Sequence, residues 1–214
     1  MNNLDFLKKY KLFIVDYDGT ILDSMRMWET TLSSFLKSEN ISFDVDIDEL
    51  SKEQTNSESV EYMNKHYFPD LTFDELSNKM YQFVKRQYVK QKLKNNATIL
   101  LNELRKYGKV VLFSATSNEL LNDSFNSTGV NDYFDYVYSA SEMKTTKTNG
   151  IGFLKVIEKE NINKEDVLVI EDVYHAISGA KEQHIDTLAI FDNQNHWNEI
   201  KELSNFNLNL DELN

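Results

Sequence analysis

Apolar residues along this chain form short unbroken runs, separated by longer stretches in which they recur every three or four positions. Four runs have the length and β-branched content of buried strands, at residues 12–15, 109–114, 167–170 and 187–191. Residues 133–138 add a fifth strand, and residues 206–210 a short edge element. The periodic stretches at 99–107, 151–160 and 175–184 predict helices between them. This alternation indicates an α/β fold with a doubly wound, parallel sheet.

Capping patterns in the sequence indicate where helices of this α/β part begin and end. Gly108 follows the 99–107 helix and is typical of a helix C-cap. Thr116 to Glu119 has the spacing of a capping box, which predicts a helix starting just after Ser114 and ending near Gly129.

Residues 24–92 interrupt the alternation, because they contain helical patterns and no strand candidate. One helix is expected from Ser24 to Leu36, a second around 60–67, and a third from the capping box Thr72–Glu75 to about residue 92. A crossover between parallel strands needs only one helix, so an insert is favoured over a series of crossover helices. The expected organisation is a core of residues 1–23 and 93–214 with an inserted helical cap at 24–92.

Composition excludes several classes of protein. The chain has 214 residues, 41% hydrophobic and 27% charged, which is typical of a globular protein. A net charge of −12 disfavours a nucleic-acid interface, and no apolar run is long enough to cross a membrane. The absence of cysteine rules out disulfides and thiolate metal sites. A cytoplasmic protein is the default expectation.

Acidic and hydroxyl residues recur where the predicted strands end. They are Asp16 and Asp18 after the first strand, Ser114 at the end of the second, and Glu171 with Asp172 after the fourth. Parallel strands end at one edge of a sheet, where ligands bind, so these side chains should meet there. Asp-Gly alone is typical of a turn, but crowded carboxylates need a cation. Oxygen ligands without His or Cys favour Mg²⁺.

Four motifs in this order resemble those of the haloacid dehalogenase superfamily, whose members are mostly magnesium-dependent phosphohydrolases with a Rossmann-like core. They are Asp16-Tyr-Asp18-Gly-Thr20, Phe113-Ser114-Ala115, Lys147 followed by Phe153, and Glu171-Asp172 followed by Ala176 to Ala180. The position of the cap resembles the subgroup of phosphoglycolate phosphatases and β-phosphoglucomutases. Thr148 and Val173 stand where that pattern has Pro and Ser. Lys144 competes for the lysine role, and the distance to Phe153 favours Lys147.

The resemblance implies a role for each matching residue. Asp16 would be the nucleophile that forms an aspartyl-phosphate, and Asp18 the general acid and base. Mg²⁺ would be bound by the carboxylates of Asp16 and Asp172 and the backbone carbonyl of Asp18, with Glu171 holding a metal-bound water. The transferred phosphoryl oxygens would be bound by Ser114, Lys147 and the amides of Tyr17 and Ala115.

A phosphatase acting on a small phosphorylated metabolite is therefore the leading interpretation, and a β-phosphoglucomutase-like phosphomutase is the nearest alternative. Mutases resemble this chain at Lys52, but Glu53, Asn56 and Ser117 stand where they carry Gly, Arg and Lys. A dehalogenase is disfavoured, because Asp18 would have no leaving alkoxide to protonate.

A phosphoacceptor like a two-component receiver is the alternative from a different class, since receivers also combine a carboxylate cluster, Mg²⁺, a hydroxyl and a lysine. Receivers are shorter and carry their phosphorylated Asp on an internal strand. Substrate specificity is expected in the cap, around Ser24, Arg26, Trp28 and residues 52–57. The sequence indicates neither the metabolite nor an oligomeric state.

Overall fold

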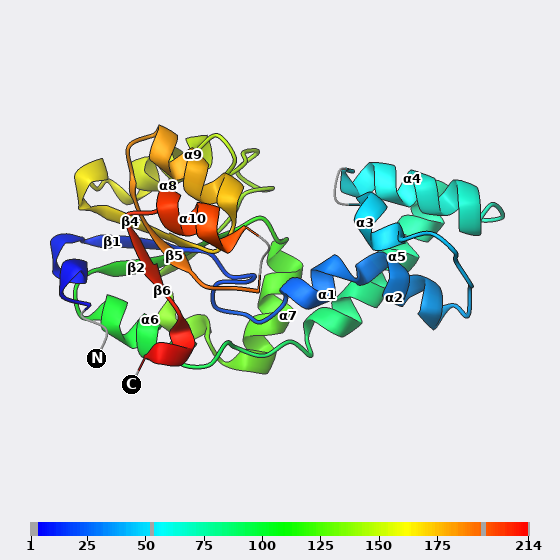
Figure 1. Cartoon of the computed structure of the whole chain (residues 1–214), viewed down its shortest axis with the longest axis horizontal. Helices are drawn as coiled ribbons and strands as arrows, with labels where there is room; N and C mark the ends of the chain where they lie inside the picture. Colours follow the sequence, from blue (N-terminus) through cyan, green and yellow to red (C-terminus); the bar gives the residue numbers. More distant parts are fainter. Residues whose placement is uncertain (1–3, 52–53, 194–195, 214) are drawn as a thin grey trace. The chain divides into compact units, whose positions relative to one another are not determined.

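The computed structural model describes residues 4–51, 54–193 and 196–213 (Figure 1). The chain divides into two compact units, one formed by Met1–Asp23 with Lys92–Asn214 and the other by Ser24–Gln91. The first unit holds the sheet, and the second consists of helices. Among the described residues, no helix has the length and apolar character needed to cross a membrane.

Among the described residues, six parallel strands form the sheet of the first unit, in the order β3-β2-β1-β4-β5-β6. Their bounds are β1 (Leu12–Val15), β2 (Lys109–Ser114), β3 (Tyr136–Ser139), β4 (Val167–Glu171), β5 (Asp186–Ile190) and β6 (Phe206–Leu208). This confirms the predicted doubly wound α/β fold, and β6 is the expected edge element. β1 lies in the interior of the sheet and all four of its side chains are buried, as its unbroken apolar run predicts.

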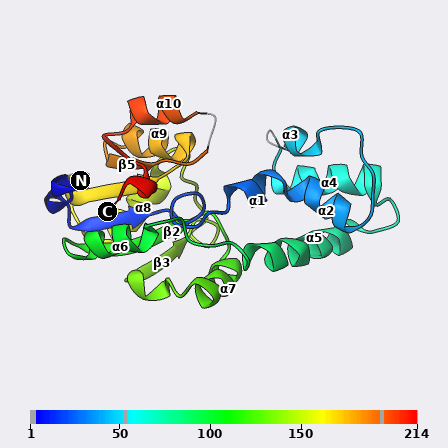
Figure 2. The ribbon, with the colours of Figure 1, turned by 60° about the horizontal axis from the view of Figure 1, so that its bottom comes forward.

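Helices cover both faces of this sheet. They are α6 (Ala97–Arg105), α7 (Asn118–Thr128), α8 (Ile151–Glu160), α9 (Tyr174–Glu182) and α10 (Trp197–Leu203). Figure 2 shows α6 and α7 on the face opposite α9 and α10. One buried cluster joins β1, β2 and β4 to α8 and α9 through residues such as Ile14, Phe113, Phe153 and Ala180. Short 3-10 helices lie at Asp5–Lys9, Asn131–Tyr133, Lys164–Asp166 and Leu210–Glu212.

The second unit has a hydrophobic core of its own, which contains Leu36, Met63, Leu76 and Phe83. Its helices are α1 (Met25–Glu29), α2 (Thr31–Ser38), α3 (Ile47–Ser51), α4 (Asn56–Tyr67) and α5 (Phe73–Tyr88). The capping box predicted at Thr72 is present, with the Thr72 hydroxyl accepting from the Glu75 amide and the Glu75 carboxylate accepting from the Thr72 amide. The helix that it opens ends at Tyr88, short of the predicted residue 92.

The prediction of one continuous helix from Ser24 to Leu36 is wrong, because the chain breaks at Thr30 between α1 and α2. The Thr30 hydroxyl donates to the Arg26 carbonyl at 2.8 Å, and that of Thr31 to the Met27 carbonyl at 2.8 Å. Threonine hydroxyls that bond back to the preceding turn bend helices. An apolar stripe gives no sign of such a break.

Two capping predictions in the first unit are also wrong. Gly108 is not the C-cap of α6, which is Lys106. A Cβ at residue 108 would lie 2.3 Å from the Lys11 carbonyl oxygen, so glycine here allows two backbone segments to approach closely. The expected capping box at Thr116 is absent, since Ser117 is the N-cap of α7 and makes no side-chain capping bond.

The two chain segments that lead to and from the helical unit are hydrogen-bonded to each other. The Asp23 amide donates to the Lys92 carbonyl, and the Lys94 amide donates to the Ile21 carbonyl, each at 2.8 Å. Leu22 and Leu93 form the antiparallel bridge between them. The chain therefore leaves the first unit and returns to it through two neighbouring, paired segments.

Candidate active site

Strand register brings the predicted acidic residues to one edge of the sheet. Val15 of β1 is level with Leu112 of β2 and with Ile170 of β4, so the residues that follow these strands emerge side by side. The Asp16 amide donates to the Ile170 carbonyl at 2.9 Å, which fixes the start of the loop after β1. Asp16, Glu171 and Asp172 are buried, and each offers a carboxylate oxygen within 4.8 Å of the others.

Lys147 lies among these carboxylates. Its ammonium is paired with Asp16 and donates to Glu171 Oε1 at 2.7 Å. The Nζ atom also lies 5.5 Å from the centre of the Phe113 ring, within cation–π range. Lys144 is exposed and has a left-handed backbone, with φ of 47°. The structure thus places Lys147, and not Lys144, beside the acidic cluster.

Two glycines allow the Lys147 loop to lie directly against α9. The loop turns at Gly150, which has φ of +71° and donates its amide to the Lys147 carbonyl at 3.0 Å. A Cβ on Gly179 of α9 would lie 2.3 Å from the Lys147 carbonyl oxygen, and one on Gly150 would lie 2.1 Å from the Gly179 carbonyl oxygen. Any other residue at either position would push the loop and the helix apart.

The two neighbouring acids after β4 are held differently. Glu171 Oε2 accepts from the amides of Asp172 and Val173, at 3.1 and 3.3 Å, while its Oε1 accepts from Lys147. Asp172 Oδ1 accepts from the Thr20 hydroxyl at 2.7 Å. The other oxygen, Asp172 Oδ2, is buried and has no hydrogen-bond partner among the described residues.

An orphaned buried carboxylate oxygen indicates a ligand that the protein itself does not supply. The potential metal ligands around it are all carboxylate oxygens, which suit a hard divalent cation such as Mg²⁺. If Asp16, Glu171 and Asp172 are all ionised, their negative charges outnumber the single positive charge of Lys147, so the ionised cluster needs a further cation. The residues present therefore fit a bound Mg²⁺.

The pKa values of the cluster point the same way. Burial, followed by the charge of Glu171, raises the pKa of Asp16 to about 8, although Lys147 opposes this shift. Burial and the charges of Glu171 and Asp16 raise the pKa of Asp172 well above its usual value. Burial disfavours the ammonium of Lys147, but Asp16 and Glu171 outweigh it and raise the pKa of this lysine. A cation that neutralises the carboxylates would favour their charged forms.

Asp18 does not join the three clustered carboxylates. Its Oδ2 accepts from the Thr116 hydroxyl at 2.8 Å, so the two acids of the first motif contact different partners. Ser114, at the end of β2, accepts from the Thr116 amide at 3.0 Å through its Oγ. This bond uses the oxygen of Ser114 as acceptor and leaves its hydroxyl proton available to donate.

The remaining predicted phosphate-binding positions, Tyr17 and Ala115, directly follow Asp16 and Ser114 in the chain. Ala115 is exposed. The Tyr17 side chain is buried, with its hydroxyl 2.8 Å from Ser124 Oγ and its ring packed edge-on against Phe125, 5.4 Å between centroids. Tyr17 thereby fastens the loop after β1 to α7.

Three residues around the cluster were missed by sequence reasoning. Thr20 positions Asp172, although its place in the first motif was visible. Thr116 contacts Asp18, where the sequence pattern suggested a helix cap. Lys94, which pairs with Asp192 and donates to the Phe191 carbonyl at 3.0 Å, tends to lower the pKa of Asp172 through its charge. No local sequence signal connects Lys94 to the site.

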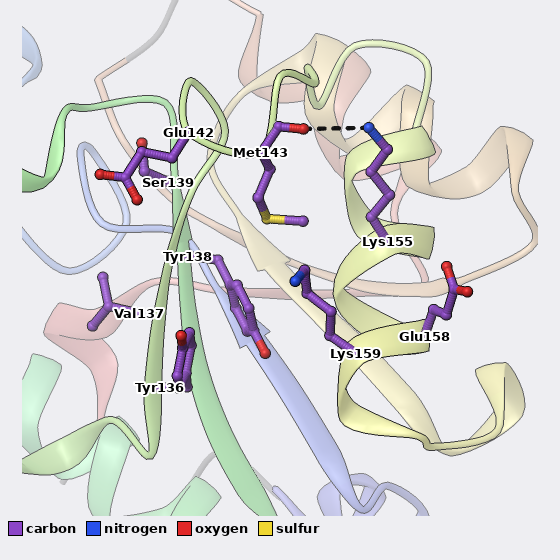
Figure 3. Close-up of a pocket in the computed structure, with 9 residues that line it drawn as sticks. All are labelled: Tyr136, Val137, Tyr138, Ser139, Glu142, Met143, Lys155, Glu158 and Lys159. Atoms are coloured by element: carbon purple, nitrogen blue, oxygen red, sulfur yellow. Dashed lines mark hydrogen bonds between the residues drawn. The ribbon is translucent and has the colours of Figure 1, made fainter.

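A cavity of about 620 Å³ lies elsewhere on the first unit, between β3, the turn that follows it, and α8 (Figure 3). Tyr136, Tyr138 and Met143 line it together with Lys155 and Lys159. None of the predicted site residues borders this cavity. Its size is typical of ligand pockets, but the chemistry predicted from the sequence lies at the acidic cluster.

Comparisons with known proteins agree with the motifs. Residues 13–190 match the model of the haloacid dehalogenase-like hydrolase family. No curated protein matches the sequence significantly.

Solved structures resemble most of the chain. A putative β-phosphoglucomutase from Thermotoga maritima superimposes with a TM-score of 0.79 at 17% identity, covering 94% of this chain and 95% of that one. The putative hydrolase YfnB from Bacillus subtilis, bound to magnesium, superimposes with a TM-score of 0.73 at 18% identity, covering 93% of this chain and 94% of that one. CbbY from Rhodobacter sphaeroides, in complex with phosphate, superimposes with a TM-score of 0.72 at 12% identity, covering 95% of this chain and 96% of that one. At these identities the likeness concerns the fold.

Proposed function

This chain belongs to the haloacid dehalogenase-like hydrolase family, and we propose that it is a magnesium-dependent phosphatase of small phosphorylated metabolites. The observation that carries the proposal is the acidic cluster at the sheet edge. Three buried carboxylates share one lysine, and Asp172 Oδ2 has no hydrogen-bond partner among the described residues. Such a cluster is built to receive a divalent cation and, next to it, an anionic phosphoryl group.

Asp16 and Asp172 would bind Mg²⁺ through their carboxylates, with the backbone carbonyl of Asp18 as a further ligand and Glu171 alongside. When bound, the metal neutralises negative charge on the carboxylates and on the phosphoryl oxygens. Both carboxylate oxygens of Glu171 accept hydrogen bonds, so its carboxyl group is held in one orientation beside the metal site. Thr20 fixes the orientation of Asp172.

The chain's own residues account for the reaction in two steps. Asp16 attacks phosphorus, the bond to the leaving oxygen breaks, and Asp18 gives that oxygen a proton. Asp18 then takes a proton from water as the water attacks the aspartyl-phosphate, which releases phosphate and restores Asp16. Lys147 and the Ser114 hydroxyl bind the phosphoryl oxygens, where charge accumulates in the transition state.

A phosphomutase would use the same first step, but would return the phosphoryl group to a second sugar position instead of to water. It would need cations to bind the distant phosphate of a bisphosphate. Ser117, at the N-cap of α7, supplies a hydroxyl where a mutase carries lysine. Lys52 and Glu53, which also bear on this distinction, lie outside the described residues. Family membership favours an enzyme over a receiver-like phosphoacceptor.

Small substrates are favoured by two features. The helical unit inserted between the first two motifs, Ser24–Gln91, contains the residues in which substrate selection is expected. The net charge of −12 repels nucleic acids and other large polyanions. We therefore propose a small phosphorylated metabolite as substrate, with no nucleic-acid or membrane partner.

Phosphate release from a panel of phosphorylated metabolites in the presence of Mg²⁺ tests this function. The panel includes sugar phosphates, phosphoglycolate and nucleotides, and each positive substrate is repeated with excess chelator. Borohydride added during turnover should reduce an acyl phosphate at Asp16 to homoserine, which mass spectrometry detects. The proposal fails if turnover persists in the chelator or if homoserine forms at another residue. Interconversion of glucose phosphates without phosphate release would instead establish the mutase.

A further inference from the structure

Thr116 is held from three sides at the edge of the sheet. Its hydroxyl donates to Asp18 Oδ2 at 2.8 Å, and its amide donates to Ser114 Oγ at 3.0 Å. Its carbonyl accepts from the hydroxyl of Ser139, a buried residue at the end of β3, at 3.3 Å. The backbone of Thr116 is thus tied to β2 and β3, and its side chain reaches the loop after β1.

The Thr116 hydroxyl serves Asp18 rather than the helix next to it. α7 begins at Asn118 with Ser117 as N-cap, and no side chain at this N-cap makes a capping bond. Ser117 Oγ is buried and has no hydrogen-bond partner among the residues that the structure describes. A capping hydroxyl stabilises the start of a helix. The N-terminus of α7 lacks such a bond, and the Thr116 hydroxyl donates to the Asp18 carboxylate instead.

We propose that Thr116 is a positioning residue for Asp18, a role that rests on the proposed function of Asp18 as general acid. By donating to Oδ2, Thr116 restricts the rotation of the carboxyl group that exchanges the proton. The Asp18 side chain has two rotatable bonds and directly precedes a turn at Gly19, whose φ is +79°. The hydroxyl therefore removes freedom that the backbone alone leaves to the acid.

The dependence on the leaving group separates this role from a merely structural one. An alkoxide is strongly basic and needs a proton as its bond to phosphorus breaks, whereas p-nitrophenolate leaves without one. General acid catalysis contributes about 10²–10⁴-fold to rates. A misoriented acid should lose part of that factor with alkyl phosphates only. The parameter to compare is kcat/KM, because it reports the steps up to P–O cleavage and excludes hydrolysis of the aspartyl-phosphate.

The experiment compares Thr116→Val, which keeps the shape and removes the donor, with Thr116→Ser, which keeps a hydroxyl. Each is assayed with the best alkyl phosphate of the panel and with p-nitrophenyl phosphate. We expect Thr116→Val to lose about 10- to 100-fold in kcat/KM on the alkyl ester, a part of the general-acid factor, and less than about 2-fold on the aryl ester. Thr116→Ser should restore most of the loss. Ser127→Ala is the matched control, since it removes a hydroxyl bond of 2.8 Å within α7, the helix that follows Thr116.

Asp18→Asn provides the reference that keeps the two hypotheses apart. If Asp18→Asn loses kcat/KM equally on both esters, Asp18 is not the general acid, and the proposed function and this inference both fail. If Asp18→Asn is selective for the alkyl ester but Thr116→Val is not, the inference alone is overturned. An equal loss on both esters by Thr116→Val, or a loss that Thr116→Ser does not recover, also overturns it. A wild-type protein inactive on both esters refutes both proposals.

Discussion

Gly179→Ala should lower activity by displacing Lys147, although residue 179 lies on a helix and touches no substrate. The new Cβ would lie 2.3 Å from the Lys147 carbonyl oxygen and 2.7 Å from both the Gly150 nitrogen and the Thr148 carbonyl oxygen. All three are backbone atoms, so no side chain can rotate to make room. Ordinary contact begins near 3.4 Å, which requires the loop or α9 to move by about 1 Å.

A displacement of about 1 Å at a group that binds the transition state costs about 100-fold in rate, equivalent to about 2.7 kcal/mol. Overpacking should also reduce stability by about 1–3 kcal/mol. The two effects are separated by measuring kcat with a panel substrate and the free energy of unfolding in urea. Gly129→Ala is the control, because its Cβ meets nothing within 4 Å while its φ of +69° is unfavourable for alanine. It should lose about 1–2 kcal/mol of stability and keep its kcat.

A double-mutant cycle decides whether Gly179 acts through Lys147. In a Lys147→Ala background, Gly179→Ala should cost less than about 3-fold in kcat, because the group that it displaces is already gone. The same 100-fold loss in both backgrounds would show that Gly179 affects another part of the site. A kcat of Gly179→Ala within about 2-fold of the wild type would show that the loop absorbs the methyl group without moving the ammonium.

Three further predictions concern the cluster itself. Asp16→Asn should abolish turnover, because it removes the nucleophile. Its thermal unfolding midpoint should stay within a few degrees of the wild type or rise, because the variant has one buried ionisable group fewer. Near-normal rates would exclude Asp16 as nucleophile. Lys147→Ala should reduce kcat by about 100-fold or more, and exposed Lys144→Ala by less than about 2-fold; the reverse order would mean that Lys144 binds the phosphoryl group. Without metal, stability measured by thermal denaturation should fall from about pH 4 to pH 8, because the unfolded chain releases the Asp16 proton near 3.8 while the folded chain holds it until about 8. Mg²⁺ should reverse that fall at pH 8, and a metal-free midpoint that rises over this range would contradict the shift.

The strands β1, β2 and β4 were predictable because each contains an unbroken apolar run, and the meeting of the carboxylates at their ends followed from the parallel order. Helices whose stability comes from tertiary contacts were harder to predict. α10 was not predicted, because its seven residues offer little periodicity. Ile200 holds it against Ile177 and Ala189, and those contacts depend on the folded sheet.

The capping pattern shows why part of the site escaped prediction. Thr72 to Glu75 and Thr116 to Glu119 share the same T-x-x-E spacing, yet only the first forms a capping box. The second threonine finds Asp18, 98 positions earlier in the chain. A local pattern states what a side chain can bind nearby, whereas a distant carboxylate that competes for it appears only once the strands are aligned. Thr20 and Lys94 escaped for the same reason.

The interior position of β1 has a consequence for biosynthesis. Leu12–Val15 leaves the ribosome before both of its neighbours, β2 at Lys109–Ser114 and β4 at Val167–Glu171. Until residue 171 has emerged, one side of this apolar segment has no partner strand, and a nascent chain in that state is prone to self-association. Asp172, the last residue of the cluster to be translated, is made at nearly the same moment. Ribosome-bound chains that stop before β4 should therefore depend on chaperones and bind no Mg²⁺ at this site, and both properties should change together when β4 becomes available.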